Sequence, residues 1–94
     1  LRTLPPLLKD AVLDTVTIAE GTTAAGKLIR ELPLRSVTGA SVVAIEREGQ
    51  SIINPAPDAL VTPGDQLLLL GSPEQVEAAR ELLTATAVND NGAE

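Results

Sequence analysis

The 94-residue sequence contains no cysteine, no histidine and no aromatic residue. Without cysteine there is no disulfide framework and no thiolate chemistry, and without histidine the commonest general base and zinc ligand is missing. A core must therefore be built from valine, leucine, isoleucine and alanine. The sequence also has no phosphate-binding glycine loop and no paired acidic cluster, so we assign no catalytic and no metal-ligating residue and expect no enzyme.

Positive charge is scarce as well, because 7 lysines and arginines stand against 13 aspartates and glutamates, for a net charge of −6. The basic residues are scattered, whereas proteins that bind DNA or RNA gather them on one face. We therefore expect no DNA or RNA partner, although one or two arginines are enough for a small ligand that carries phosphate. No apolar run approaches the length of a membrane span. The chain starts at Leu1 rather than Met, which suggests a piece of a longer protein.

Alternating apolar and β-branched residues predict a sheet. The predicted strands are Val12–Ala19, Ser41–Glu48, Ser51–Asn54 and Leu67–Leu70. The continuous leucines of the last strand indicate burial on both faces. Gly49-Gln50 predicts a tight hairpin between the second and third strands.

Two helices complete the pattern. Apolar residues at helical spacing predict one helix over Ala24–Leu32, ended by Pro33, after which Val37 is expected to contact the core. Ser72 followed by Pro73 predicts the start of a second helix. The order is β-α-β-β-β-α, which we interpret as an α+β sandwich with both helices on one face of a small sheet. We expect a linker or arm at residues 1–11, a domain at 12–84 and a disordered tail at 85–94.

Three charged residues of the central region admit two interpretations. Asp58 and Asp65 have the side-chain chemistry to bind a cation, but each adjoins Pro or Gly in a turn, where Asp accepts backbone hydrogen bonds; we favour this structural role. Arg47 alternates with Ile45, and we interpret it as a solvent-facing strand arginine, with a place in a dimer cleft as the alternative.

Several segments, taken together and in register, resemble the TrkA-C domain, also called RCK-C. The segments are Val16–Glu20, Gly26–Leu32, Gly39–Arg47, Asn54–Asp58 and Gly64–Gly71. The resemblance covers roughly residues 14 to 83. No single segment is specific, since Pro-Gly-Asp alone is only a turn, so the resemblance depends on the whole series.

This resemblance implies a cytoplasmic regulatory domain at the inner face of the membrane. Such domains belong to bacterial potassium channels, potassium uptake systems and cation/proton antiporters that exchange K+ or Na+ for protons, either fused or as separate subunits. They pair as homodimers, and several bind cyclic di-AMP between two protomers. No Gly-x-Gly-x-x-Gly fingerprint occurs, so no NAD or ATP cofactor is expected.

The positions that match the ligand-binding residues of cyclic di-AMP-binding relatives are Leu34, Arg35, Ser41, Val42 and Pro55. In that role the three apolar residues would sandwich adenine, the serine would contact its edge, and the arginine would hold phosphate. The relatives often carry Asp and Asn where this chain has Pro33 and Ser41.

A structural role is the alternative for the same residues. Arg35 would then be solvated or paired with Glu31, Leu34 and Val42 would belong to the core or a dimer interface, and Pro55 would simply end a strand. Two functions follow: a ligand-sensing regulatory domain of a cation transporter, or a purely structural dimerisation module that binds no nucleotide.

Overall fold

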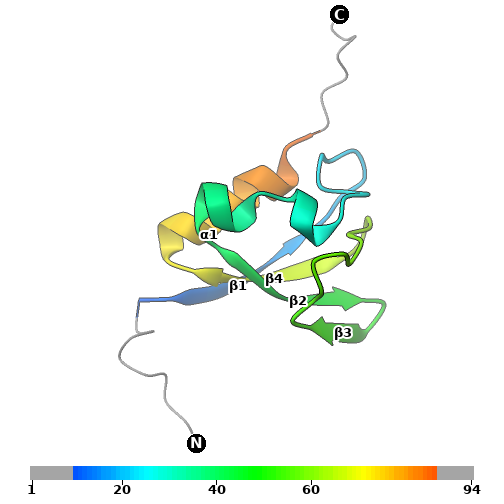
Figure 1. The fold of residues 1–94 in the computed structure, drawn as a ribbon, viewed down its shortest axis with the longest axis horizontal. Helices are drawn as coiled ribbons and strands as arrows, with labels where there is room; N and C mark the ends of the chain where they lie inside the picture. The colour runs from blue at the N-terminus through cyan, green and yellow to red at the C-terminus, as the bar shows by residue number, and fades with distance from the viewer. Residues whose placement is uncertain (1–9, 87–94) are drawn as a thin grey trace, which may run out of the picture.

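The structure, a computed structural model, describes residues 10–86. They form a four-stranded antiparallel sheet with helical segments over one of its faces (Figure 1). In chain order the elements are β1 (Val12–Thr17), η2 (Ile29–Glu31), η3 (Leu34–Thr38), β2 (Ser41–Arg47), β3 (Gln50–Ile53), β4 (Gln66–Gly71) and α1 (Pro73–Thr84). The strands lie in the order β1-β4-β2-β3. The predicted α+β class, with helices on one face, is confirmed.

The core lies between the central strands and the helical segments. On β4, Leu67 and Leu69 are fully buried, whereas Leu68 and Leu70 are only half-buried. Alternate residues of a strand point to opposite faces, and α1 packs against one face only. The prediction that this strand is buried on both faces is therefore wrong for residues 10–86.

The predicted α-helix at Ala24–Leu32 is also wrong. Gly26 adopts a left-handed backbone with φ +87°, which interrupts an α-helical path. Its N–H donates to the carbonyl of Val61 at 2.7 Å, and the N–H of Arg30 donates to the carbonyl of Pro57 at 2.8 Å. The segment therefore pairs with a distant loop, and only the single 3₁₀ turn of η2 is helical.

Residues expected to form a plain connection make a second helical turn, η3, which is a five-residue π-helix that starts directly after Pro33. It ends at Gly39, where φ is +83° and the N–H donates to the carbonyls of Leu34 and Arg35 at 3.0 and 3.1 Å. Leu34 is 3% exposed, whereas Val37 is 68% exposed. The core contact of this turn is thus Leu34, and the prediction for Val37 is wrong.

The predicted hairpin between β2 and β3 is present, but it turns at Glu48-Gly49 and not at Gly49-Gln50, because Gln50 already pairs with Arg47 in the sheet. Glu48 and Gly49 have φ values of 53° and 81°, the left-handed pair that a tight hairpin between twisted strands requires. At the start of α1, the hydroxyl of Ser72 accepts a hydrogen bond from the N–H of Gln75 at 3.2 Å. The side chain of Gln75 accepts in return from the N–H of Ser72 at 2.9 Å. The predicted cap is confirmed.

The predicted arm at residues 1–11 and tail at 85–94 fall almost wholly outside residues 10–86, so the proposed limits of the domain, 12–84, stay a prediction. None of the helices within residues 10–86 has the length and apolar character needed to cross a bilayer.

Candidate ligand-binding pocket

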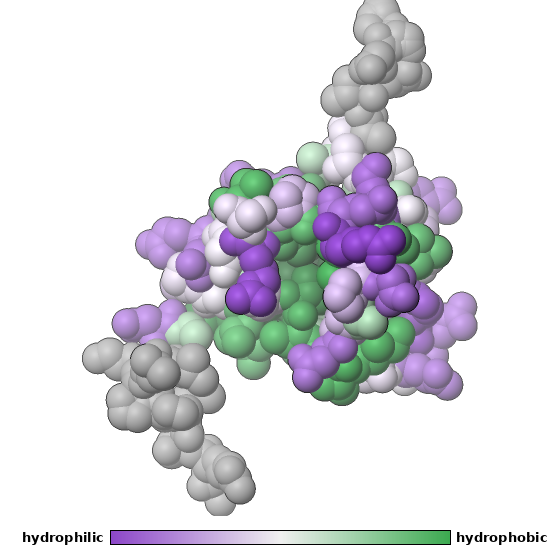
Figure 2. All heavy atoms as spheres, in the orientation of Figure 1, coloured by the Kyte–Doolittle hydropathy of each residue, from purple (hydrophilic) through white to green (hydrophobic). Residues whose placement is uncertain are grey.

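A pocket of about 550 Å³ opens beside the helical segments. Its wall consists of residues 29–36, the first two residues of β2, and two prolines of the loop after β3. Figure 2 shows apolar side chains in the middle of this face of the molecule, with strongly hydrophilic side chains on either side. The five residues selected from the sequence all line this one pocket: Leu34, Arg35, Ser41, Val42 and Pro55.

The turn η3 positions the first two of these side chains. Leu34 is anchored in the core, while its neighbour Arg35 is exposed. Because Gly39 closes the turn with hydrogen bonds to both carbonyls, the backbone beneath Arg35 is held in place. The turn therefore fixes the base of the arginine and leaves its guanidinium free to move toward a ligand.

A β-bulge in β2 positions the next two. Val42 is paired with Leu69, and Ala44 with Leu68, so Val43 is the extra residue of the bulge. The bulge directs Val42 toward the helical layer, where it packs against the core. The N–H of Asn54 donates to the carbonyl of Val43 at 2.9 Å. This bond holds the start of the loop that carries Pro55 next to the bulge.

Arg35 does not form the ion pair with Glu31 that the sequence suggested as an alternative. The carboxylate of Glu31 instead accepts a hydrogen bond from the N–H of Leu28 at 2.8 Å. Within residues 10–86, the salt bridges involve only Arg47 and Arg80 as cations. Arg35 is thus a solvent-exposed cation at the edge of an apolar hollow.

Arg47 is not the solvent-facing arginine expected from the strand pattern. Its guanidinium donates from Nε and Nη2 to the two carboxylate oxygens of Asp65, each at 2.7 Å, and Nη2 also donates to the carbonyl of Leu60 at 2.7 Å. The N–H of Thr62 donates to the same carboxylate at 2.8 Å. Asp65 is 1% exposed, and the hydrogen bonds from Arg47 lower the pKa of its carboxyl.

The structural role of Asp65 is confirmed, but its main partner was missed. The turn Pro63-Gly64-Asp65 indicated backbone hydrogen bonds, and the sequence gives no signal for an arginine 18 residues away. The pair ties the loop between β3 and β4 to the end of β2, on residues that do not line the pocket.

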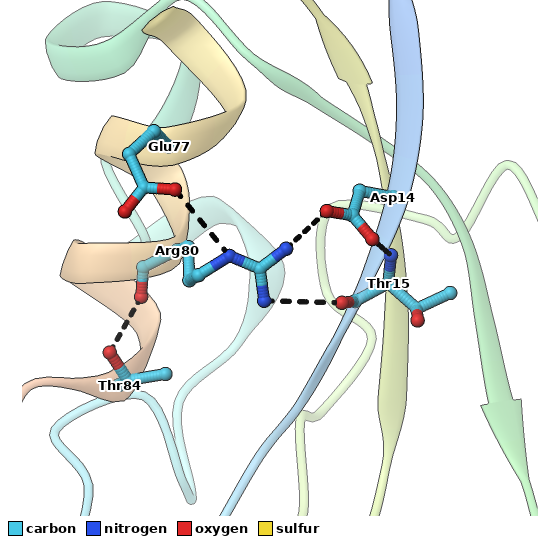
Figure 3. A network of polar contacts seen from close by, with 5 residues as sticks. All are labelled: Asp14, Thr15, Glu77, Arg80 and Thr84. Carbon is cyan, nitrogen blue, oxygen red and sulfur yellow. Dashed lines mark hydrogen bonds and ion pairs between the residues drawn. The ribbon is translucent and has the colours of Figure 1, made fainter. Parts of the chain in front are cut away.

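Arg80 is engaged in a second polar network, which joins α1 to β1 (Figure 3). Its guanidinium donates to the carboxylate of Asp14 and, at 3.5 Å, to the carbonyl of Thr15. Glu77 lies one turn earlier in the helix, with its carboxylate 3.8 Å from Nε. All these groups are at least partly exposed, and they position the helix on the edge of the sheet.

Comparison with known proteins assigns the family. The sequence profile of the TrkA-C domain matches residues 15–84 of this chain. The chain belongs to the TrkA-C domain family. The resemblance found in the sequence is thereby confirmed, and this TrkA-C domain is a regulatory domain and not an enzyme.

Two solved TrkA-C domains are similar over most of their length. The RCK_C domain of BusR from S. agalactiae, solved as a dimer in complex with c-di-AMP, is 30% identical with a TM-score of 0.69, over 76% of this chain and 93% of that one. The RCK C domain of the potassium transport protein KtrA, in complex with cyclic diadenosine monophosphate, is 25% identical with a TM-score of 0.71, over 80% and 86%. Both relatives thus have the same fold and were solved with the same nucleotide.

A curated relative is much longer than this TrkA-C domain. A probable potassium channel protein 2 of Methanocaldococcus jannaschii is 29% identical over 75 residues, which are 80% of this chain and 22% of that protein. A longer BusR chain, 38% of which is covered at 31% identity and a TM-score of 0.69, was solved with its promoter DNA. The absence of a DNA partner therefore stays a prediction.

The chain is a regulatory domain of the kind found in potassium transport.

Proposed function

We propose that this TrkA-C domain senses cyclic di-AMP and regulates a monovalent cation transporter at the inner, cytoplasmic face of the membrane. The transporter is a potassium channel, a potassium uptake system or a cation/proton antiporter, fused to the domain or associated with it. The complexes of BusR and KtrA with this nucleotide, and the similarity to a potassium channel protein, support the proposal.

One observation carries the proposal: the five matched residues, which are spread over 22 positions of the sequence, line a single pocket. Their chemistry suits the nucleotide. Val42 and Pro55 offer apolar surface for an adenine ring, whereas Leu34, which is 3% exposed, belongs mainly to the core beneath the pocket. The hydroxyl of Ser41 is a hydrogen-bond partner for the edge of the ring. Arg35 supplies a planar guanidinium for a phosphate.

The ligand is held between two copies of the domain. Val37 and Ile53, each 68% exposed, lie within two residues of pocket residues in the chain. A second protomer would cover such apolar side chains and close the open side of the pocket. A two-fold interface would also bring two Arg35 side chains to the two phosphates of a two-fold symmetric ligand.

Regulation then follows from the geometry of the pair. A ligand that contacts both protomers stabilises the relative orientation of the two protomers in which it binds most tightly. It shifts the transporter between states only by the difference of its affinities for the two arrangements.

Thermal unfolding with and without cyclic di-AMP tests the proposal. Wild type is expected to gain thermal stability with ligand, because binding to the folded state alone stabilises it. Arg35→Gln is expected to lose most of this gain. Lys27→Gln is the matched control, since it removes the same charge from an exposed residue that does not line the pocket. It should behave as wild type.

Two results would count against the proposal. Wild type without any ligand-dependent shift would refute the nucleotide ligand and leave a structural dimerisation module. An undiminished shift in Arg35→Gln would show that the nucleotide binds elsewhere.

A further inference from the structure

The arginines of residues 10–86 fall into two groups. Arg47 and Arg80 are used by the fold, in the ion pairs described above. Arg30 and Arg35 form no salt bridge within this part of the chain, and both line the same pocket. In a chain whose net charge is −6, two unpaired guanidiniums beside one hollow need an explanation.

We propose that Arg30 is a second phosphate-binding residue of the pocket, acting together with Arg35. The identity of the ligand, a cyclic dinucleotide, rests on the function proposed above. The two-arginine anion site does not rest on that function, because it is argued from two guanidiniums that line one pocket and form no salt bridge within residues 10–86.

The backbone at Arg30 is held by the loop after β3, which also lines the pocket. Its N–H donates to the carbonyl of Pro57 at 2.8 Å, and Pro57 itself lines the pocket. Arg30 thus stands on η2, and Arg35 on η3, with both backbones held by hydrogen bonds. Because the backbone at each arginine is already held in place, less conformational entropy is lost when the two side chains bind an anion.

The acidic residue of the pocket lining cancels only part of this charge. Glu31 also lines the pocket, but its carboxylate accepts the N–H of Leu28. Counting Arg30 and Arg35 as +1 each and Glu31 as −1, the lining has a charge of +1 per chain. Charge-assisted hydrogen bonds from two guanidiniums favour a ligand with more than one phosphate over a neutral nucleoside.

Titration calorimetry with cyclic di-AMP tests the role of Arg30. Arg30→Gln is expected to bind about tenfold more weakly than wild type, the effect of losing a hydrogen bond to a charged group. Arg30→Lys is expected to restore part of the affinity, and Lys27→Gln to leave it unchanged. Thermal unfolding without ligand should be the same for Arg30→Gln and wild type, because the fold uses only the backbone of this residue. Wild-type affinity in Arg30→Gln would overturn the inference.

A second probe separates this inference from the proposed function. If wild type does not bind cyclic di-AMP, inorganic pyrophosphate is titrated while the Nε–Hε signals of the arginines are followed by NMR. In wild type, pyrophosphate is expected to shift the signals of both Arg30 and Arg35. In the Arg30→Gln variant, the shift at Arg35 is expected to disappear or to need about tenfold more pyrophosphate. These results would support the anion site and refute only cyclic di-AMP as its ligand. Unshifted Arg30 would overturn the inference.

Discussion

At the scale of single residues, Asp65 stands out as a charge that the fold has buried. A carboxylate with 1% exposure is costly unless its oxygens are hydrogen-bonded. Arg47 supplies two hydrogen bonds and Thr62 a third, so both oxygens are satisfied. The hydrogen bonds from Arg47 favour the charged carboxylate more than burial disfavours it, and the pKa of Asp65 is therefore lowered.

This lowered pKa predicts a dependence of stability on pH. The ordinary pKa is 3.8, and the folded state holds it below that value. The stabilising contribution of Asp65 is therefore complete well above 3.8 and is lost as the pH falls through the folded pKa. Asp65→Asn is expected to be less stable than wild type at pH 7 by about 1–2 kcal/mol, and to lose less between pH 6 and pH 3. Urea unfolding of both proteins at these pH values measures the free energies of unfolding. Equal losses of stability in wild type and Asp65→Asn between pH 6 and pH 3 would contradict a lowered pKa at Asp65.

Arg30 shows why residue-level reasoning from the sequence was incomplete. The resemblance to relatives supplied five pocket positions, and all five meet in the structure. An α-helix over Ala24–Leu32 would have turned Arg30 away from its apolar stripe. Because the segment is a series of turns and bends with one 3₁₀ turn, Arg30 lines the pocket instead.

At the scale of elements, the strands and the final helix follow from local rules. Alternation, the left-handed hairpin pair and the Ser72 cap each specify a short segment by contacts within that segment. The helical region before β2 does not. The N–H groups of Gly26, Ile29 and Arg30 donate to carbonyls of residues 57–61, and no local pattern shows which distant loop will accept them.

One ion pair, Arg47 with Asp65, ties the loop between β3 and β4 to the end of β2, and this predicts a difference between two arginines. Arg47→Met is expected to destabilise the domain by about 2 kcal/mol, because it leaves the buried carboxylate of Asp65 without two of its hydrogen bonds. Arg80→Met is the control: its ion pair with Asp14 is exposed, and such pairs are worth less than about 1 kcal/mol. Urea unfolding of both variants measures the difference. Equal effects would show that the buried pair of Arg47 and Asp65 stabilises the domain no more than the exposed pair of Arg80 and Asp14.

At the scale of the whole molecule, the pocket and the exposed apolar side chains near it indicate a surface that another molecule covers. The proposed function completes it with a second copy of the domain and one nucleotide between the two. The sequence supplied this assembly only through the resemblance to a family, because neither periodicity nor composition specifies a two-fold interface.

Titration calorimetry of the wild-type domain with cyclic di-AMP tests the central claim most directly. A ligand shared by two protomers predicts saturation at about one nucleotide per two chains. Saturation at one nucleotide per chain would contradict the shared site, and no heat of binding at any concentration of the nucleotide would contradict the claim that the domain senses it.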